Sequence, residues 1–298
     1  MSSARGFGVV SDVHGRQVLV GYDGSPVASA AIEAGALLFP GARAWIGHLW
    51  TPPFASEELR KRLWTGKRNI NAFVEAIERE GGREADRLTS VGVMLARSAG
   101  WDAEPLVCRS YGGEGLRLAE LADEKQADVL LLGSRGLGGA RAVLGSVSDM
   151  AVHYSPRPVL VVPHPLLTDE HEALAAGPVV VGWDASAGAE AALDSARRLF
   201  PERDVILVAV DGDEETPAVD AQSVTTLRVS AGRGATGRAV GEALSAVATE
   251  HRASAVVVGS RGRTAVRKIL LGSVAMATLH RAHRPVMVVP PSPVREAE

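Results

Sequence analysis

Residues 128–136 read DVLLLGSRG, and the same stretch returns as SAVVVGSRG at residues 254–262. In both places a short run of apolar residues ends directly in a glycine-rich segment. An unbroken apolar run of this length is typical of a strand buried on both faces, as in a parallel sheet covered by helices. The stretch therefore favours an α/β fold, and its return indicates that the chain repeats itself.

The repetition extends over most of the 298 residues. Three further segments recur in the same order: VLVGYDGS at 18–25 as VVVGWDAS at 179–186, LGSV at 144–147 and again at 271–274, and RPVLVVP at 157–163 as RPVMVVP at 284–290. Agreement in order, residue type and spacing over so many positions indicates a duplication. We predict two domains of one kind, over residues 1–165 and 175–298.

In each copy, short apolar runs alternate with helical patterns. In the first copy we expect strands near 17–22, 43–50, 104–109, 128–133 and 158–162, and helices near 26–38, 56–98, 114–125 and 143–153. In the second we expect strands near 178–183, 204–210, 225–229, 254–259 and 285–289, and helices near 187–199, 236–250 and 270–281. This alternation predicts two tandem doubly wound α/β domains, each a five-stranded, mostly parallel sheet flanked by helices.

The second copy is shorter than the first. It has no counterpart to most of residues 55–99, so we predict that it lacks most of the second crossover helix. Residues 211–222 read as a polar loop at that point. The joint between the copies, residues 163–177, contains two prolines and several acidic residues, and we predict a loop there.

Composition narrows the class of protein. The formal net charge is -3 and no block of Lys or Arg stands out, which argues against a nucleic-acid-binding surface. Cys108 is the single cysteine, so the chain forms no internal disulfide and suits a reducing compartment. Residues 1–16 lack the apolar core of a signal peptide, and no run approaches 18 apolar residues. We expect a cytoplasmic protein without a membrane partner.

A glycine-rich segment separates a buried strand from a helix in each copy. Glycines let the backbone turn sharply and approach a ligand closely. The free N–H groups at a helix start, together with the helix dipole, attract negative charge. The hydroxyl groups of Ser146, Ser148 and Ser273 add donors. These segments are therefore candidate phosphate cradles.

A simpler alternative is that Gly133 and Gly136 only form a tight turn and that Ser146 caps a helix. An aspartate at the end of the first strand, Asp23 in one copy and Asp184 in the other, accompanies the glycine segment both times. The repeated combination of loop and acid favours a nucleotide.

The pattern Gly-x2-Gly-x9-Gly-Ser after the fourth strand, with an aspartate ending the first, resembles the ATP-binding branch of the universal stress protein family. The chain looks like a tandem-domain member of the actinobacterial type, and the resemblance covers nearly everything from Arg16 to Pro290. The second copy has the full spacing, but Ala275 stands where the family often has a second Ser or Thr. The first copy has only eight residues between Gly136 and Gly145.

The resemblance implies an adenine nucleotide alpha hydrolase-like fold for each copy and ATP, with or without Mg²⁺, as the ligand. It implies that the aspartate and the residues around it hold the base, and that the glycine loop holds ribose and phosphates. In the first copy the implied residues are Gly21, Asp23, Leu49, Gly133, Arg135, Gly136, Gly145, Ser146, Val147 and Ser148. In the second they are Gly182, Asp184, Val210, Gly259, Arg261, Gly262, Gly272, Ser273 and Val274. All follow the carboxyl ends of parallel strands, where open sheets bind ligands.

Other motifs carry less weight. Gly232, Gly234 and Gly237 satisfy a dinucleotide-binding fingerprint, but no acid ends the following strand, so we interpret them as a pliable loop before a helix. The eight histidines show no metal-ligand spacing, and no arrangement of Ser, His and Asp points to a catalyst. We predict no catalytic residue and no metal ligand.

We therefore expect an ATP-binding protein with a regulatory, stress-response role, in which hydrolysis is absent or slow, rather than an enzyme. One alternative is a slow ATPase or another nucleotide-using enzyme on the same fold. Another is a structural module that has lost its ligand in one or both copies.

The last strands of the two copies, residues 159–162 and 286–289, are apolar on both faces. Such a strand at a sheet edge would promote aggregation unless it were paired. The resemblance implies that this strand joins two domains, so we expect the two strands to pair antiparallel within the chain. The result would be an intramolecular pseudo-dimer with its nucleotide sites opening away from the seam, and a further homodimer is compatible with it.

Overall fold

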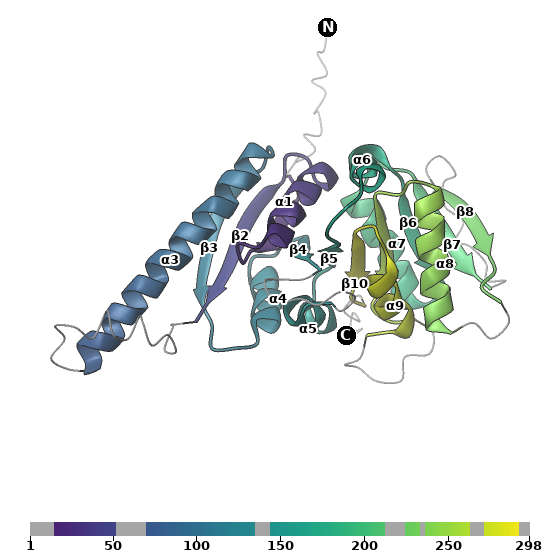
Figure 1. Ribbon diagram of the computed structural model, residues 1–298. Helices are drawn as coiled ribbons and strands as arrows, with labels where there is room; N and C mark the ends of the chain where they lie inside the picture. Colours follow the sequence, from purple (N-terminus) through teal and green to yellow (C-terminus); the bar gives the residue numbers. More distant parts are fainter. Residues whose placement is uncertain are drawn as a thin grey trace, which may run out of the picture.

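The computed structural model describes residues 15–51, 70–134, 144–211, 224–232, 236–262 and 271–291. The strands in these residues form one ten-stranded sheet in the order β3-β2-β1-β4-β5-β10-β9-β6-β7-β8 (Figure 1). The first half comprises β1 (Gln17–Gly21), β2 (Arg43–Trp50), β3 (Asp102–Arg109), β4 (Val129–Gly133) and β5 (Val159–Val162). The second comprises β6 (Val179–Trp183), β7 (Val205–Val210), β8 (Val224–Val229), β9 (Ala255–Gly259) and β10 (Val286–Val289).

Within each half all neighbouring strands are parallel, and the two halves have the same strand order, which confirms the predicted fold class. The strand order reverses between β1 and β4 in the first half and between β6 and β9 in the second. At such a switch point the connections leave in opposite directions, and a crevice opens at the carboxyl ends of the two strands.

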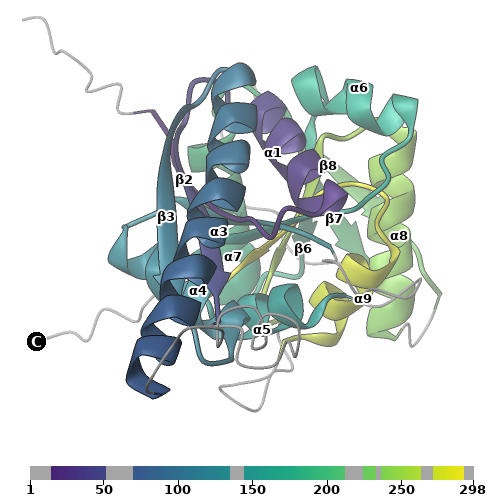
Figure 2. The same cartoon turned by 60° about the vertical axis from the view of Figure 1, so that its left-hand side comes forward.

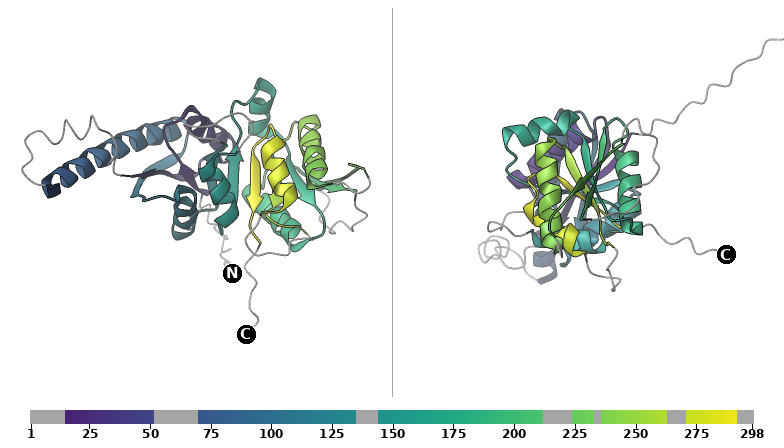
Figure 3. Two further views of the ribbon diagram at one scale, coloured as in Figure 1. Left: turned by 60° about the horizontal axis from the view of Figure 1, so that its bottom comes forward. Right: turned by 90° about the vertical axis from the view of Figure 1, so that its right-hand side faces the viewer.

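The helices cover the sheet in two layers, as the two turned views show (Figures 2 and 3). One layer contains α1 (Pro26–Leu38), α3 (Ile70–Ser98), α6 (Thr168–Ala176) and α7 (Ala187–Leu199). The other contains α4 (Glu114–Glu124), α5 (Ser146–Tyr154), α8 (Gly237–Glu250) and α9 (Ser273–Arg281). Along each strand, alternate residues enter alternate cores, as Val18 and Leu19 do. Each core runs through both halves.

The expected antiparallel pairing of the two terminal strands is present. In β5 and β10, Val161 lies opposite Val286, Leu160 opposite Met287 and Val159 opposite Val288. All of these side chains are buried. We refer to this pairing of β5 with β10 as the seam. Neither apolar strand therefore lies at an edge of the sheet.

Repeated residues also meet across the two halves. Phe39 and Phe200, which follow α1 and α7 at equivalent places in the repeat, stack with their ring centroids 5.2 Å apart. Both rings are almost fully buried. Offset stacking of this kind adds to the stabilisation that burial alone provides.

The joint between the copies is not the loop that the sequence predicts, because it contains α6. Glu170 lies in the first turn, where a carboxylate favours the helix dipole, and its side chain accepts a hydrogen bond of 2.6 Å from the backbone N–H of Leu167. Leu174, on the inner side of α6, is fully buried. The helix packs beside α1 (Figure 2).

The two halves differ in the length of chain that joins their second and third strands. The first half carries the 29-residue α3, which extends beyond the sheet (Figure 3, left). The sequence prediction began this helix near residue 56, but residues 52–69 lie outside the described part. In the second half only residues 211–223 join β7 to β8, and of these Asp211 alone is described.

Candidate functional site

The two aspartates at the switch points are held in the same way. Asp23 follows β1, and its Oδ1 accepts a hydrogen bond from the N–H of Ser25 at 3.0 Å. Asp184 follows β6, and its Oδ1 accepts from both the N–H (3.1 Å) and the hydroxyl (2.5 Å) of Ser186. Each serine in turn caps the next helix. The tight turn thus holds the carboxylate at the carboxyl edge of the sheet.

Gly21 and Gly182, which we expected to line a base, are occupied on their side-chain face by the core. A Cβ on Gly21 would lie 2.5 Å from Cδ2 of Leu132 and 2.9 Å from Cδ1 of Leu118. A Cβ on Gly182 would lie 3.2 Å from Cδ1 of Leu244. Any ligand contact of these two residues therefore runs through the backbone.

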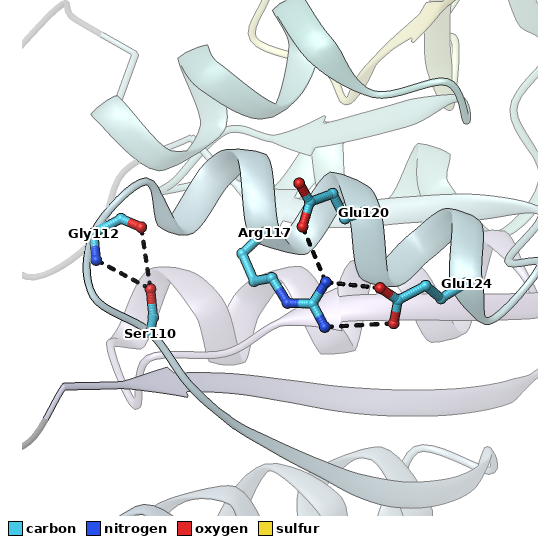
Figure 4. Close-up of polar contacts among 5 residues, drawn as sticks. All are labelled: Ser110, Gly112, Arg117, Glu120 and Glu124. Atoms are coloured by element: carbon cyan, nitrogen blue, oxygen red, sulfur yellow. Dashed lines mark hydrogen bonds and ion pairs between the residues drawn. The ribbon is translucent and has the colours of Figure 1, made fainter.

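Helix α4, which supplies Leu118, carries an ion-pair network on its own outer surface (Figure 4). Arg117 donates hydrogen bonds to Glu124 at 2.7 Å and to Glu120 at 3.0 Å, and these two carboxylates, Glu124 first, raise the pKa of Arg117 above its usual value. Before the helix, the N–H of Gly112 donates to the hydroxyl of Ser110 at 3.3 Å. These contacts lie within α4 and the turn before it, whereas α4 packs on β1 and β4 through buried side chains such as Leu118 and Leu121.

The glycines that end the fourth strand of each half also serve packing. A Cβ on Gly133 would lie 2.6 Å from Cγ1 of Val27, in the first turn of α1. A Cβ on Gly259 would lie 2.5 Å from the carbonyl oxygen of Gly188, in the first turn of α7. The close approach of helix to strand explains both residues without a ligand.

The second glycine loop brings three predicted residues together. A Cβ on Gly262 would lie only 2.6 Å from Oδ2 of Asp184. A Cβ on Gly272, where the chain re-enters a helix, would lie 3.8 Å from the backbone nitrogen of Gly262. The N–H of Gly272 donates to the carbonyl of Ser260 at 2.8 Å, which closes the loop at its base. The aspartate and both ends of the loop thus converge at the switch point.

Helices α5 and α9 present their amino ends at the same edge. The N-cap residues are Gly145 and Gly272, which have no side chain with which to cap. The N–H groups of the first turn have no carbonyl partner within the helix, as in every α-helix, and here no cap side chain takes that place. Ser146 and Ser273 open these helices and are exposed. Val147 and Val274, the next residues, offer backbone N–H groups beside them.

Ser148 has a different role from the one expected. The residue is 4% exposed, and its hydroxyl donates a hydrogen bond of 2.7 Å to the carbonyl of Gly133. The bond ties α5 to the end of β4. Its counterpart in the second copy, Ala275, is buried as well. Because Ala275 has no hydroxyl, the second copy lacks the hydrogen bond that ties the helix to the strand end in the first copy.

The remaining predicted residues lie at the margins of the site. Leu49 and Val210 are half-buried near the ends of β2 and β7 and pack against the core of α4, α5, α8 and α9. Arg261 follows β9. Arg135 and Gly136 lie outside the described residues, so the first copy's loop stays a prediction.

Sequence reasoning missed the part that His48 plays. Its Nδ1 lies 2.8 Å from the carbonyl oxygen of Tyr22, the residue before Asp23, and ties β2 to the end of β1. A histidine two residues before the end of a predicted strand carries no recognisable signal for this role.

Close packing of two helices explains Gly237, the last glycine of the dinucleotide-binding fingerprint. A Cβ on Gly237, the first residue of α8, would lie 2.5 Å from Cβ of Ser273. Gly241, one turn later, would meet Cβ of Ala277 at 2.8 Å. These glycines let α8 and α9 pack closely.

No helix in the described part of the chain is long and apolar enough to cross a membrane. No group of three or more His, Cys, Asp or Glu side chains is arranged there to hold a metal ion.

The fold is an α/β fold of the adenine nucleotide alpha hydrolase-like type, built from two halves. The fold matches that of a universal stress protein from Archaeoglobus fulgidus, with a TM-score of 0.61 at 19% identity, over 92% of this chain and 96% of that one. The model of the universal stress protein family matches residues 15–163 and 235–290. The chain belongs to this family.

Mycobacterial relatives agree. A universal stress protein of Mycolicibacterium smegmatis is 34% identical over 188 residues, which cover 56% of this chain and 63% of that protein. One from Mycobacterium tuberculosis H37Rv is 32% identical over 194 residues, which cover 57% of this chain and 64% of the relative. The match thus spans less than two thirds of either relative.

Proposed function

We propose that this protein binds ATP in a regulatory, stress-response role and hydrolyses it slowly or not at all. One observation carries the proposal: Asp184, Gly262 and Gly272 converge beside the open amino end of α9, at a switch point of the sheet. An acceptor for a base and a glycine cradle for phosphates are the two parts that a nucleotide requires.

Each part of the ligand has candidate partners. Asp23 and Asp184 would accept a hydrogen bond from the adenine or the ribose. In Asp23 the Oδ2 oxygen accepts no hydrogen bond from any residue that the structure describes. Leu49 and Val210 would supply apolar contact to the base.

The phosphates would lie at the helix starts. The first-turn N–H groups of Ser146 and Val147 in one half, and of Ser273 and Val274 in the other, would bind phosphate oxygens, with the helix dipole adding to the attraction. Gly145 and Gly272 have no side chain with which to cap these starts. A magnesium ion would be held mainly through phosphates and water, as is usual for Mg²⁺.

The same geometry offers little for hydrolysis. The Oδ1 oxygens of Asp23 and Asp184 accept hydrogen bonds from the turn that follows, and both carboxylates lie at the proposed base end. A general base must reach the water that attacks the γ-phosphate. We therefore infer a protein that responds to ATP binding rather than one that consumes ATP.

We further propose that residues 1–165 and 175–298 form the two domains, arranged as a pseudo-dimer about the seam, in a cytoplasmic protein. The stacked rings of Phe39 and Phe200 and the pairing of β5 with β10 support this arrangement. A homodimer of the whole chain would require a further surface.

Calorimetry with ATP tests the proposal. We expect the wild-type chain to bind two ATP molecules, and Asp23→Ala and Asp184→Ala each to weaken one site. Loss of a charged hydrogen-bond acceptor costs about 1.5–3 kcal/mol, or about a 10- to 150-fold rise in Kd. Unchanged stoichiometry and affinity in the double variant would overturn the assignment. A turnover assay with Mg²⁺ separates the regulatory proposal from an enzyme.

A further inference from the structure

Helices α1 and α7 begin at the two proposed nucleotide sites. Ser25 caps α1 and donates its backbone N–H to Asp23. Ser186 does the same for α7 and Asp184. In each half the cap and the aspartate share one tight turn. A ligand that shifts the aspartate therefore also shifts the start of the helix.

The same helix starts are packed against the strand ends that carry the glycine loops. A Cβ on Gly133 would lie 2.6 Å from Cγ1 of Val27, in the first turn of α1. A Cβ on Gly188, in the first turn of α7, would overlap the carbonyl oxygen of Arg261, within the second loop. Packing this close leaves no gap that could absorb a movement of the loop. Closure of a loop on a phosphate would therefore displace the helix behind it.

The far ends of α1 and α7 meet each other. Each helix has 13 residues and is therefore about 20 Å long. Phe39 and Phe200 are their C-cap residues, and the two rings stack with their centroids 5.2 Å apart. Both rings are almost fully buried. In each half a rigid helix thus runs from the proposed site to a contact with the other half.

Polar contacts reinforce this junction. Arg203, which follows α7, donates at 3.1 Å to the carbonyl of Leu37, in the last turn of α1. Arg198, in the last turn of α7, forms an ion pair of 2.7 Å with Asp128, in the turn before β4. The other carboxylate oxygen of Asp128 accepts from the N–H of Gln17 at 2.9 Å. The end of each helix is therefore tied to the opposite half.

We propose that α1 and α7 couple the two ATP sites, so that ATP bound in one half raises the affinity of the other half for ATP. This inference rests on the proposed function. Equivalent helices that meet end to end pack best when both take the same position, so a chain with one shifted and one unshifted helix is the least stable form. Coupling between two sites typically changes affinity by about 5- to 150-fold and is reciprocal. The protein would then respond to ATP as one unit.

Hydrogen exchange in Gly262→Val tests the coupling. This variant keeps only the first ATP site, so an effect of ATP on α7 must cross between the halves. We expect ATP to slow amide exchange in α7 by about fivefold or more, because the stacked rings hold α7 in the ligand-bound position. Adding Phe39→Leu/Phe200→Leu removes the stack but keeps apolar side chains, and should abolish this protection. Calorimetry on the same samples should show that the first site still binds ATP.

Leu160→Val/Met287→Val, in the same background, is the matched control. These two residues also meet across the halves and are fully buried, but they lie on the seam and not at helix ends. The protection of α7 should survive this change. If Phe39→Leu/Phe200→Leu does not fold, Phe200→Leu alone must reduce the protection.

Three results would overturn the coupling: exchange in α7 that ATP does not slow, protection that survives loss of the stack, or equal loss of protection in the stack and seam variants. In all three, calorimetry still shows ATP binding, so the proposed function stands. Absence of any binding heat with the wild-type chain would overturn the proposed function and the coupling with it.

Discussion

At the scale of single residues, the glycines of the site divide into two groups. Gly21, Gly133, Gly182 and Gly259 are explained by close packing of helices and side chains on the strand ends. Gly262 instead faces the carboxylate of Asp184, at the proposed nucleotide site. A repeated glycine in the sequence does not reveal which of these two reasons requires it.

Gly262→Val should abolish ATP binding at the second site alone. The new side chain would begin 2.6 Å from Oδ2 of Asp184 and fill the cradle. Calorimetry should then give one ATP per chain instead of two. Gly82→Ala is a suitable control, because a Cβ there meets only Trp50, at 3.8 Å. Two filled sites in Gly262→Val would mean that the loop is only a turn.

The two serines at the start of α5 should behave differently. Ser148→Ala removes the hydrogen bond to the carbonyl of Gly133 and should lower the free energy of unfolding by about 1–3 kcal/mol, with little change in ATP affinity. Ser146→Ala, at an exposed position, should leave stability nearly unchanged and weaken ATP binding at the first site. Urea unfolding and calorimetry on both variants measure the two effects. The reverse pattern would contradict these roles.

At the scale of elements, Arg203 shows how the joint is fixed. Its guanidinium donates to the carbonyl of Leu174 at 2.7 Å, and to those of Leu37 and Gly177 at 3.1 Å. The three carbonyls belong to the ends of α6 and α1 and to the residue after α6. Burial lowers the pKa of Arg203 below its usual value.

Arg203→Ala should therefore destabilise the protein by about 1.5–3 kcal/mol, the range for hydrogen bonds made by a charged group. Arg198→Ala, which breaks a half-exposed ion pair with Asp128, should cost only about 0–1 kcal/mol. Chemical unfolding compares the two variants directly. Equal losses would show that the joint contributes no more than a surface contact.

Elements with a strong periodic signal were predictable from the sequence, and the joint was not. Strand β4 and helix α7 lie within a residue of their expected bounds, because apolar runs and the serine cap mark their ends. The sequence predicts a loop in place of α6 because Pro163 and Pro165 precede it. It is held by burial of Leu174 and by Arg203, contacts between distant segments that no local pattern contains.

The site was predictable only as far as its residue types. Sequence reasoning placed Asp184 and Gly272 at the carboxyl ends of strands, and the structure brings both beside Gly262. It did not predict the hydrogen bond from Ser148 to the carbonyl of Gly133, or the cavity at the seam that Arg157 lines. Both depend on how helices pack on the sheet, and spacing along the chain carries little information on that.

At the scale of the whole molecule, the seam should be essential. Val161 and Val288 are almost fully buried, each paired with a residue of the opposite strand. Val161→Asp/Val288→Asp would bury two unpaired charges, which costs several kcal/mol for each. We expect the halves to separate or the protein to precipitate, as small-angle scattering and unfolding would detect. Thr225→Asp/Thr226→Asp, at exposed positions of the outer strand β8, is the control and should leave both measurements unchanged.

The pairing of β5 with β10 also has a consequence during synthesis on the ribosome, because β5 is made long before its partner. Strand β5 leaves the exit tunnel with its apolar edge open, and its partner β10 follows only after residues 163–285 have been made. At about 5–20 residues per second, this interval lasts about 6–25 s. During translation the nascent chain therefore exposes VLVV as an open edge, a natural target for a chaperone. Translation arrested near residue 230 should give chains that crosslink to chaperones through residues 159–162, and release of the full-length chain should abolish the crosslink.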